Sequence, residues 1–139
     1  MHRFLIVFVC FVAAAPVSAQ NADLRGAAER ARHAWFTHNP DVLVAESPRL
    51  LVQLPGADPS VALGPAQAAA LLGDYIASSQ EVETVVRAAR EVGAGTGYVE
   101  LLRRYRVAGT QNVRAQLLLL SYRQIRGTWS LVEFRVVGS

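Results

Sequence analysis

Arg103 is the side chain whose place in the sequence most clearly calls for a chemical partner. Residues 97–107 alternate between apolar and polar types, as expected for a strand with one buried face, and Arg103 falls on the same side as Val99 and Tyr105. A buried guanidinium is costly unless it meets a carboxylate, a ligand anion or an opening to water. We therefore predict that Arg103, Tyr105 and Trp35 line a pocket for a small acidic or polar ligand.

The competing interpretation of Arg103, which we prefer by a small margin, is a β-bulge near Leu101 and Leu102 that turns the side chain outward beside Arg104. Water would then solvate the guanidinium, and no ligand would be required. The inward placement assumes that Val107 pairs with Val113 across the following loop. The two interpretations differ in the face of the sheet on which Arg103 lies.

The remaining ionisable side chains form no pattern typical of a catalytic or metal site. His33 and His38 are five positions apart, so on a helix they lie on different sides and do not share a metal. Phosphate-binding and Ser–His–Asp motifs are absent from the sequence. We predict no catalytic residue, metal ligand or cofactor. The alternative is an enzyme that uses Asp41 or Glu46 with Arg103 or His38, which a carboxylate or His near Arg103 in an open pocket would favour.

Residues 1–19 are predicted to form a cleavable signal peptide. Arg3 supplies a positive charge, the apolar run 4–15 follows, and the small residues Val17 and Ala19 precede the expected cleavage site. The run is shorter than the roughly 20 residues with which a helix crosses a bilayer. We therefore expect a secreted or periplasmic protein.

Residues 20–139 are expected to form one domain with a single core. The one cysteine of the chain, Cys10, lies in the predicted leader, so packing rather than disulfide bonds must stabilise this domain. All 14 Lys or Arg residues are arginines, against 11 acids. The formal net charge of +3 is too small to predict nucleic-acid binding.

The periodicity of apolar residues changes from helical to alternating near Gln80. The predicted N-terminal elements are helices at 23–38, 41–46 and 65–78 and a short hairpin of 49–54 and 61–63. Asp23 or Asn21 is the expected cap of the first helix. Four long strands are predicted at 81–92, 97–107, 113–125 and 128–137. Their short connections require an antiparallel meander.

Alternation along these strands divides the predicted sheet into two faces. The face expected beneath the helices is almost wholly apolar and collects Val82, Val86, Ala88, Val92, Val99, Leu101, Tyr105, Val107, Val113, Ala115, Leu117, Leu119, Val132, Phe134 and Val136. The opposite face carries a cluster of Leu102, Leu118, Leu120, Tyr122, Trp129 and Leu131. A sheet face in water rarely carries so many large apolar groups together. We predict a homodimer through this cluster; the alternative is cover by long Arg side chains.

Three segments in this order of elements give the chain a resemblance to the nuclear transport factor 2-like superfamily, which includes ketosteroid isomerases and polyketide cyclases. They are Ala28–Phe36 followed by Asn39–Asp41, the helix Pro65–Ser78, and the final strand Gly127–Val136. The resemblance implies an α+β fold: a curved antiparallel sheet with two to three helices on its concave face. It also implies a conical pocket and, frequently, a dimer.

The resemblance does not imply one activity, because this fold hosts both enzymes and binding proteins. Enzymes of the superfamily usually place an Asp, His or Tyr inside the cone, whereas the predicted apolar face has no acid in mid-strand. We therefore predict an exported, non-catalytic binding or interaction module. The alternatives are a small-molecule isomerase, lyase or hydrolase, and a structural dimer whose pocket is filled by its own side chains.

Overall fold

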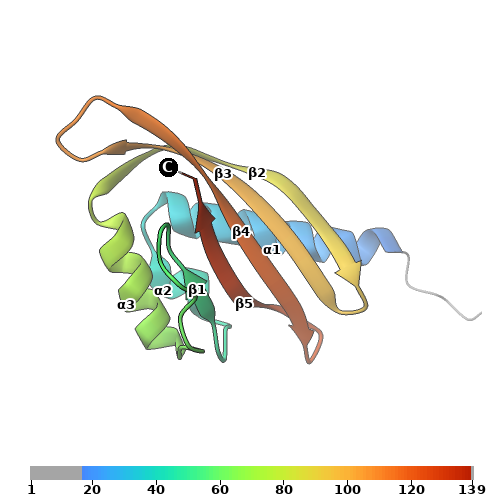
Figure 1. Ribbon diagram of the computed structural model, residues 1–139. Helices are drawn as coiled ribbons and strands as arrows, with labels where there is room; N and C mark the ends of the chain where they lie inside the picture. Colours follow the sequence, from blue (N-terminus) through green and yellow to red (C-terminus); the bar gives the residue numbers. More distant parts are fainter. Residues whose placement is uncertain (1–16, 139) are drawn as a thin grey trace, which may run out of the picture.

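The structure is a computed structural model that describes the backbone of residues 17–138 and the side chains of residues 23–138. Within these residues, three helices and five strands follow one another (Figure 1). They are α1 (Val17–Phe36), α2 (Pro40–Val44), β1 (Leu51–Gln53), α3 (Pro65–Ile76), β2 (Ser79–Gly93), β3 (Thr96–Val107), β4 (Val113–Ile125) and β5 (Thr128–Val137). Most of the predicted signal peptide, residues 1–16, lies outside the described residues.

The five strands form one curved, open sheet in the order β1-β5-β4-β3-β2. β2 to β5 are the predicted antiparallel meander, and β1 adds a parallel strand beside β5, with Leu51 opposite Glu133. The predicted N-terminal hairpin is present only in part: its two arms share an isolated antiparallel bridge between Leu50 and Leu63 and a hydrogen bond from Ser60 N–H to the Val52 carbonyl (2.8 Å), and 61–63 forms no strand. Two prolines, Pro55 and Pro59, lie between these arms and have no N–H to give to a ladder.

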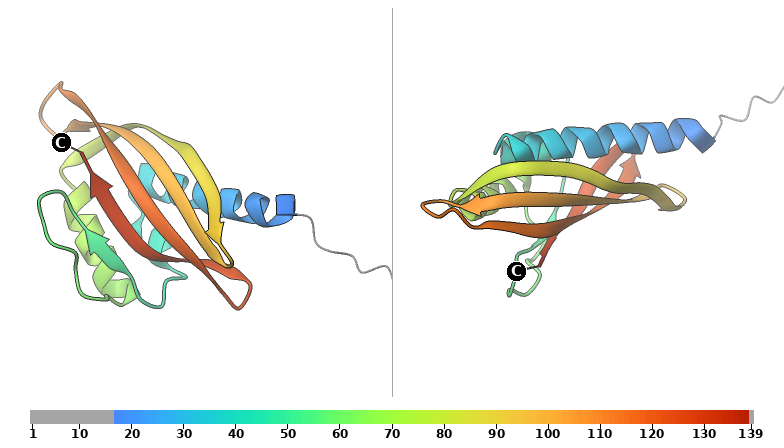
Figure 2. Two further views of the ribbon diagram at one scale, coloured as in Figure 1. Left: turned by 45° about the vertical axis from the view of Figure 1, so that its right-hand side comes forward. Right: turned by 90° about the horizontal axis from the view of Figure 1, so that it is seen from above.

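α1 runs across one face of the sheet (Figures 1 and 2). It begins at Val17 and ends at Phe36, so the expected caps Asn21 and Asp23 lie inside the helix. His38 then takes a left-handed φ of 54°, which reverses the chain direction. The side chain of Asn39 accepts a hydrogen bond from the backbone N–H of Val42 (3.4 Å) and caps α2. α1 and α2 therefore meet at a tight corner.

The faces of β3 agree with the alternation in its sequence, but those of β4 are the reverse of the prediction. Val113 pairs with Arg106 rather than with Val107. A shift of one residue in register moves every side chain of a strand to the other face. Leu118 and Leu120 are consequently buried under the helices, while Leu117 and Leu119 lie on the outer face.

β-bulges change the faces of the two other long strands. In β5 a bulge opposite Ser121 and Tyr122 adds one residue, so Trp129 and Leu131 join Phe134 on the helix side. The predicted dimerisation cluster is therefore not a surface. Five of its six members are at most 6 % exposed within the core, and Leu102 alone remains on the outer face.

In β2 the register shifts three times, and the predicted inward residues Val82 and Val92 are exposed. Thr84 is buried in their place.

One hydrophobic core fills the space between the helices and the sheet. α1 contributes Leu24, Ala28 and Trp35, and α3 contributes Leu72 and Ile76. The Trp35 ring stacks on Phe134, with 5.3 Å between ring centroids. Among the described helices, none combines the length and the apolar character that spanning a membrane requires.

Candidate functional site

Arg103 points into the core from β3, and its side chain is 1 % exposed. The outward alternative is wrong, since the bulges beside it occur in β2 and the pairing of β3 with β4 is regular through Leu101 and Leu102. The guanidinium carbon lies 4.0 Å from the ring centroid of Tyr105 and 4.9 Å from that of Trp35. Arg103 thus lies against both of the other predicted site residues.

The partner of Arg103 is Glu81 of β2, whose side chain is 2 % exposed. Arg103 Nε donates to Glu81 Oε2 (3.2 Å), and Nη2 donates to Oε1. The carboxylate neutralises the guanidinium, so no ligand anion is required there. Sequence reasoning missed Glu81, because it faces inward only through the bulge between Glu81 and Glu83, which alternation does not reveal.

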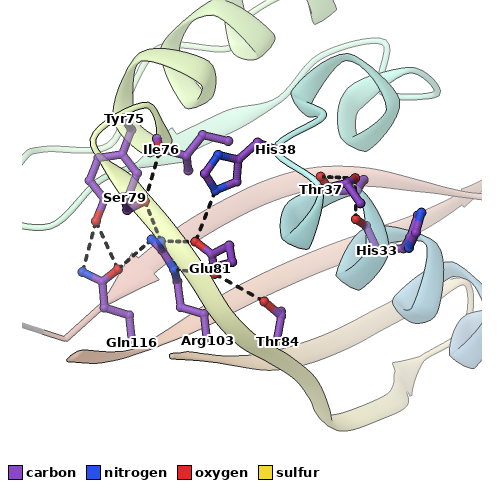
Figure 3. A network of polar contacts seen from close by, with 11 residues as sticks. His33, Thr37, His38, Tyr75, Ile76, Ser79, Glu81, Thr84, Arg103 and Gln116 are labelled. Atoms are coloured by element: carbon purple, nitrogen blue, oxygen red, sulfur yellow. Dashed lines mark hydrogen bonds and ion pairs between the residues drawn. The ribbon is translucent and has the colours of Figure 1, made fainter. Parts of the chain in front are cut away.

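The other donors of Arg103 also have acceptors within the protein (Figure 3). Nη2 donates to Ser79 Oγ (2.9 Å) and Nη1 donates to Gln116 Oε1 (3.2 Å). The Gln116 amide in turn donates to the Tyr75 hydroxyl (3.0 Å), while Thr84 Oγ1 donates to Glu81 (3.4 Å). Such a satisfied polar network stabilises one arrangement of a core and leaves little capacity for a ligand.

The network approaches the surface at His38, whose side chain is 32 % exposed. His38 Nε2 lies 3.6 Å from Glu81 Oε1, which is longer than a hydrogen bond. Both residues border an open depression of about 510 Å³. Its lining consists of Phe36, Thr37, His38, Ser79, Gln80, Glu81 and Arg106. A carboxylate and a His therefore lie near Arg103, but the carboxylate is occupied by the ion pair.

A second, more enclosed pocket of about 210 Å³ lies between α1, α2 and the sheet; we call it the α1–α2 pocket. It is lined by Ala27, Arg30, Ala31, Val42, Leu43, Ala45, Glu46, Ser47, Tyr122, Trp129 and Leu131. Its sheet side is supplied by the residues that β4 and β5 turn inward against expectation. None of the three predicted ligand residues, Trp35, Arg103 and Tyr105, lines it.

Two polar groups of the sheet side of this pocket are buried. The indole N–H of Trp129 is buried and finds no acceptor among the described residues. Burial raises the pKa of the Tyr122 hydroxyl above its ordinary value, and the Arg30 charge lowers it by a smaller amount. The Tyr122 hydroxyl therefore stays protonated at neutral pH and can donate.

Arg30 lies between the α1–α2 pocket and a neighbouring pocket of about 340 Å³, and it lines both of them. Trp129 also borders both. The Arg30 guanidinium extends back over Gly26, one turn earlier on α1, where a Cβ would lie 3.5 Å from Arg30 Nη1, an ordinary contact distance. Of the alternative catalytic acids, Glu46 lines the α1–α2 pocket, whereas Asp41 is an exposed residue of α2. Within residues 23–138, no three His, Cys, Asp or Glu side chains are grouped as metal ligands would be.

No family model and no curated protein matches the sequence. The structure, however, is similar to several solved ones. A ketosteroid isomerase-like protein from Erwinia carotovora atroseptica is 14% identical, with a TM-score of 0.67 over 84% of this chain and 94% of that chain. A nuclear transport factor 2-like protein with a cystatin-like fold from Novosphingobium aromaticivorans is 13% identical, with a TM-score of 0.63 over 86% and 82%.

A third similar structure is a protein with the ketosteroid isomerase-like fold from Catenulispora acidiphila, solved in complex with trimethylamine. It is 14% identical to this chain, and the TM-score is 0.64 over 81% of this chain and 85% of that chain. Identities this low carry information on the fold but not on the activity. The curved sheet, the helices on one face and these similarities together establish that the chain has the nuclear transport factor 2-like, or cystatin-like, fold.

Proposed function

We propose that this chain is an exported, non-catalytic binding protein that holds a small molecule in the α1–α2 pocket. The observation that carries the proposal is at Trp129, a residue that lines two pockets and whose buried indole N–H has no acceptor among the described residues. An unsatisfied buried donor costs about 1–3 kcal/mol. A ligand that supplies the acceptor recovers this cost. Trp35 also has an unpartnered indole N–H, but it borders neither pocket.

A binding role fits the chemistry of the lining better than a catalytic one. General acid–base catalysis needs a group held in reach of the reacting proton and tuned by its neighbours. Around the α1–α2 pocket the only carboxylate is the exposed Glu46, and no His is among the lining residues. The buried carboxylate of Glu81 already forms a hydrogen-bonded ion pair with Arg103. The trimethylamine complex of the Catenulispora protein supports the use of this fold to hold small molecules.

One observation favours an enzyme as the second candidate. His38 lies at the open depression with Glu81 behind it, an arrangement in which a carboxylate could orient an imidazole acting as a base. Under this alternative, an isomerase, lyase or hydrolase would lose at least 100-fold in kcat on His38→Gln. Under the binding proposal, any ligand is recovered chemically unchanged and its affinity is insensitive to His38→Gln.

The proposal is tested by native mass spectrometry of the protein recovered from an exporting bacterial host. We expect a chain that begins at Gln20 and that carries a small-molecule adduct, either as isolated or after incubation with a library of small polar compounds. Denaturing the protein should release the adduct intact. A chain that retains residues 1–19 contradicts export, and the lack of any adduct with the whole library contradicts the binding role.

A further inference from the structure

We infer that the ligand of the α1–α2 pocket is a small carboxylate with an apolar body, bound through Arg30; this inference rests on the binding role proposed above. Three side chains of the lining can donate hydrogen bonds. Trp129 contributes an indole N–H that has no acceptor among the described residues, Tyr122 contributes a hydroxyl, and Arg30 contributes a guanidinium, while Glu46 and Ser47 also contribute acceptors. A carboxylate offers about four lone-pair sites and can accept from several donors at once.

Arg30 is the strongest of these donors. The described residues hold five ion pairs, and none of them includes Arg30, although its near neighbours Glu29 and Arg32 pair with each other. A guanidinium binds a carboxylate with two parallel hydrogen bonds, which a neutral group does not reproduce. Arg30 therefore has its charge free of an ion pair with any described residue; it is exposed, as Glu46 is, so water partly screens its attraction for an anion.

The rest of the lining sets the size and polarity of the ligand. Ala27, Ala31, Leu43 and Leu131 form apolar walls. The volume of about 210 Å³ is below the roughly 300–1,000 Å³ of pockets for drug-sized molecules. A ligand of the size of benzoate, with one carboxylate and a compact apolar part, fits this description.

Glu46 places a negative charge on the same lining, so substitutions of Glu46 and of Arg30 should change the affinity for a charged ligand in opposite directions. The carboxylate is exposed, so its repulsion of an anionic ligand is partly screened by water. Removing this charge should strengthen the binding of an anion, whereas removing the charge of Arg30 should weaken it. A pocket that recognises an amine would show the opposite signs.

The experiment is calorimetric titration of the wild-type protein with benzoate, its neutral analogue benzamide and the cation benzylamine. We expect benzoate to bind about tenfold more tightly than benzamide, and benzylamine not to bind. Arg30→Gln should weaken benzoate binding about tenfold and leave benzamide unchanged, while Glu46→Gln should strengthen benzoate binding. Arg25→Gln removes an exposed arginine of the same helix that lines neither pocket, and it should change nothing.

Equal affinities for benzoate and benzamide, or an Arg30→Gln variant with wild-type affinity for benzoate, overturn the carboxylate inference and leave the binding role intact. Tighter binding of benzylamine also overturns the inference and identifies an amine site. If none of the three compounds binds, the inference fails; the binding role fails with it only if the compound library also yields no adduct. Circular dichroism of each variant separates a lost contact from a lost fold.

Discussion

The ion pair of Arg103 and Glu81 places two opposite charges beside the hydrophobic core, where the buried polar groups of Ser79, Thr84 and Gln116 bond to them. Each side chain is at most 2 % exposed, and each depends on the other for neutralisation. Removing one partner of such a pair leaves an uncompensated buried charge, which costs about 3–5 kcal/mol. The pair therefore stabilises a single arrangement of β2, β3 and the α1 corner, and its role is structural.

Glu81→Gln is predicted to lower the free energy of unfolding by about 3–5 kcal/mol in urea denaturation. The matched control is Glu83→Gln, two positions along the same strand. Glu83 pairs with Arg104, but both side chains are about half exposed (53% and 50%), and a pair of this kind contributes at most about 1 kcal/mol. Equal losses in the two variants would contradict a buried charge pair.

A double substitution tests whether the loss of stability comes from a lone buried charge. Replacing both charges together, with Arg103→Met and Glu81→Leu, should recover most of the stability that Glu81→Gln alone removes, because no lone charge remains. A double variant as unstable as Glu81→Gln would instead indicate that the loss comes from packing. Urea denaturation of the three proteins in one buffer makes this comparison.

At the scale of the elements, the bounds of α3 and of the four long strands follow closely from the sequence, whereas the start of α1 and the strand expected at 61–63 do not. Gly64 and Pro65 open α3 where predicted, and turns at Gly93–Gly95 and Arg126–Gly127 separate strands of the expected lengths. These signals are local, since they depend on the backbone preferences of Gly and Pro and on apolar periodicity. Local signals are the ones that a sequence carries directly.

The faces of β4 could not be predicted, because residues 117–120 are four consecutive leucines. In such a run the odd-numbered and the even-numbered residues are equally apolar. Which of the two sets faces the helices therefore depends on the register that the preceding loop imposes. Trp129 and Glu81 were misplaced for a related reason, since each faces inward only through a bulge. The sheet side of the α1–α2 pocket consists of Tyr122, Trp129 and Leu131, which these changes of register turn inward, and the pocket was missed for that reason.

The register of β4 predicts opposite outcomes for two adjacent leucines. Leu118→Ala deletes a fully buried side chain from the core and should cost about 2–5 kcal/mol in urea denaturation. Leu117→Ala changes the partly exposed outer face and should cost less than about 1 kcal/mol. If Leu117→Ala cost more than Leu118→Ala, the result would favour the pairing of Val107 with Val113 that the sequence suggested. It would contradict the register of β4 on which the α1–α2 pocket depends.

At the scale of the whole molecule, the outer face of the sheet is not covered by the helices. Val85, Leu102, Leu117 and Val137 are successive partners across four strands and form an apolar row there. We propose that two copies of the chain associate through this row, which takes the place of the buried cluster expected from alternation. Charged residues flank it, among them Glu100 and Arg104.

Leu102→Glu is predicted to convert a dimer into a monomer in analytical ultracentrifugation, because it places an unpaired charge in the apolar row. Glu100→Gln, next to the row on the same strand, serves as the control and should leave the dimer intact. A dissociation constant of 1 micromolar corresponds to about 8 kcal/mol of association free energy. A wild-type protein that sediments as a monomer at roughly 100 micromolar would contradict association through this face.

The most direct test of the binding role is the indole N–H resonance of Trp129 in proton–nitrogen correlation spectra. The chain has two tryptophans, so Trp129→Phe assigns the two indole signals. On titration with benzoate, we predict that the Trp129 signal moves downfield as its N–H gains an acceptor, while the Trp35 signal stays in place. A Trp129 signal that does not move with benzoate or with any compound of the library would contradict the account.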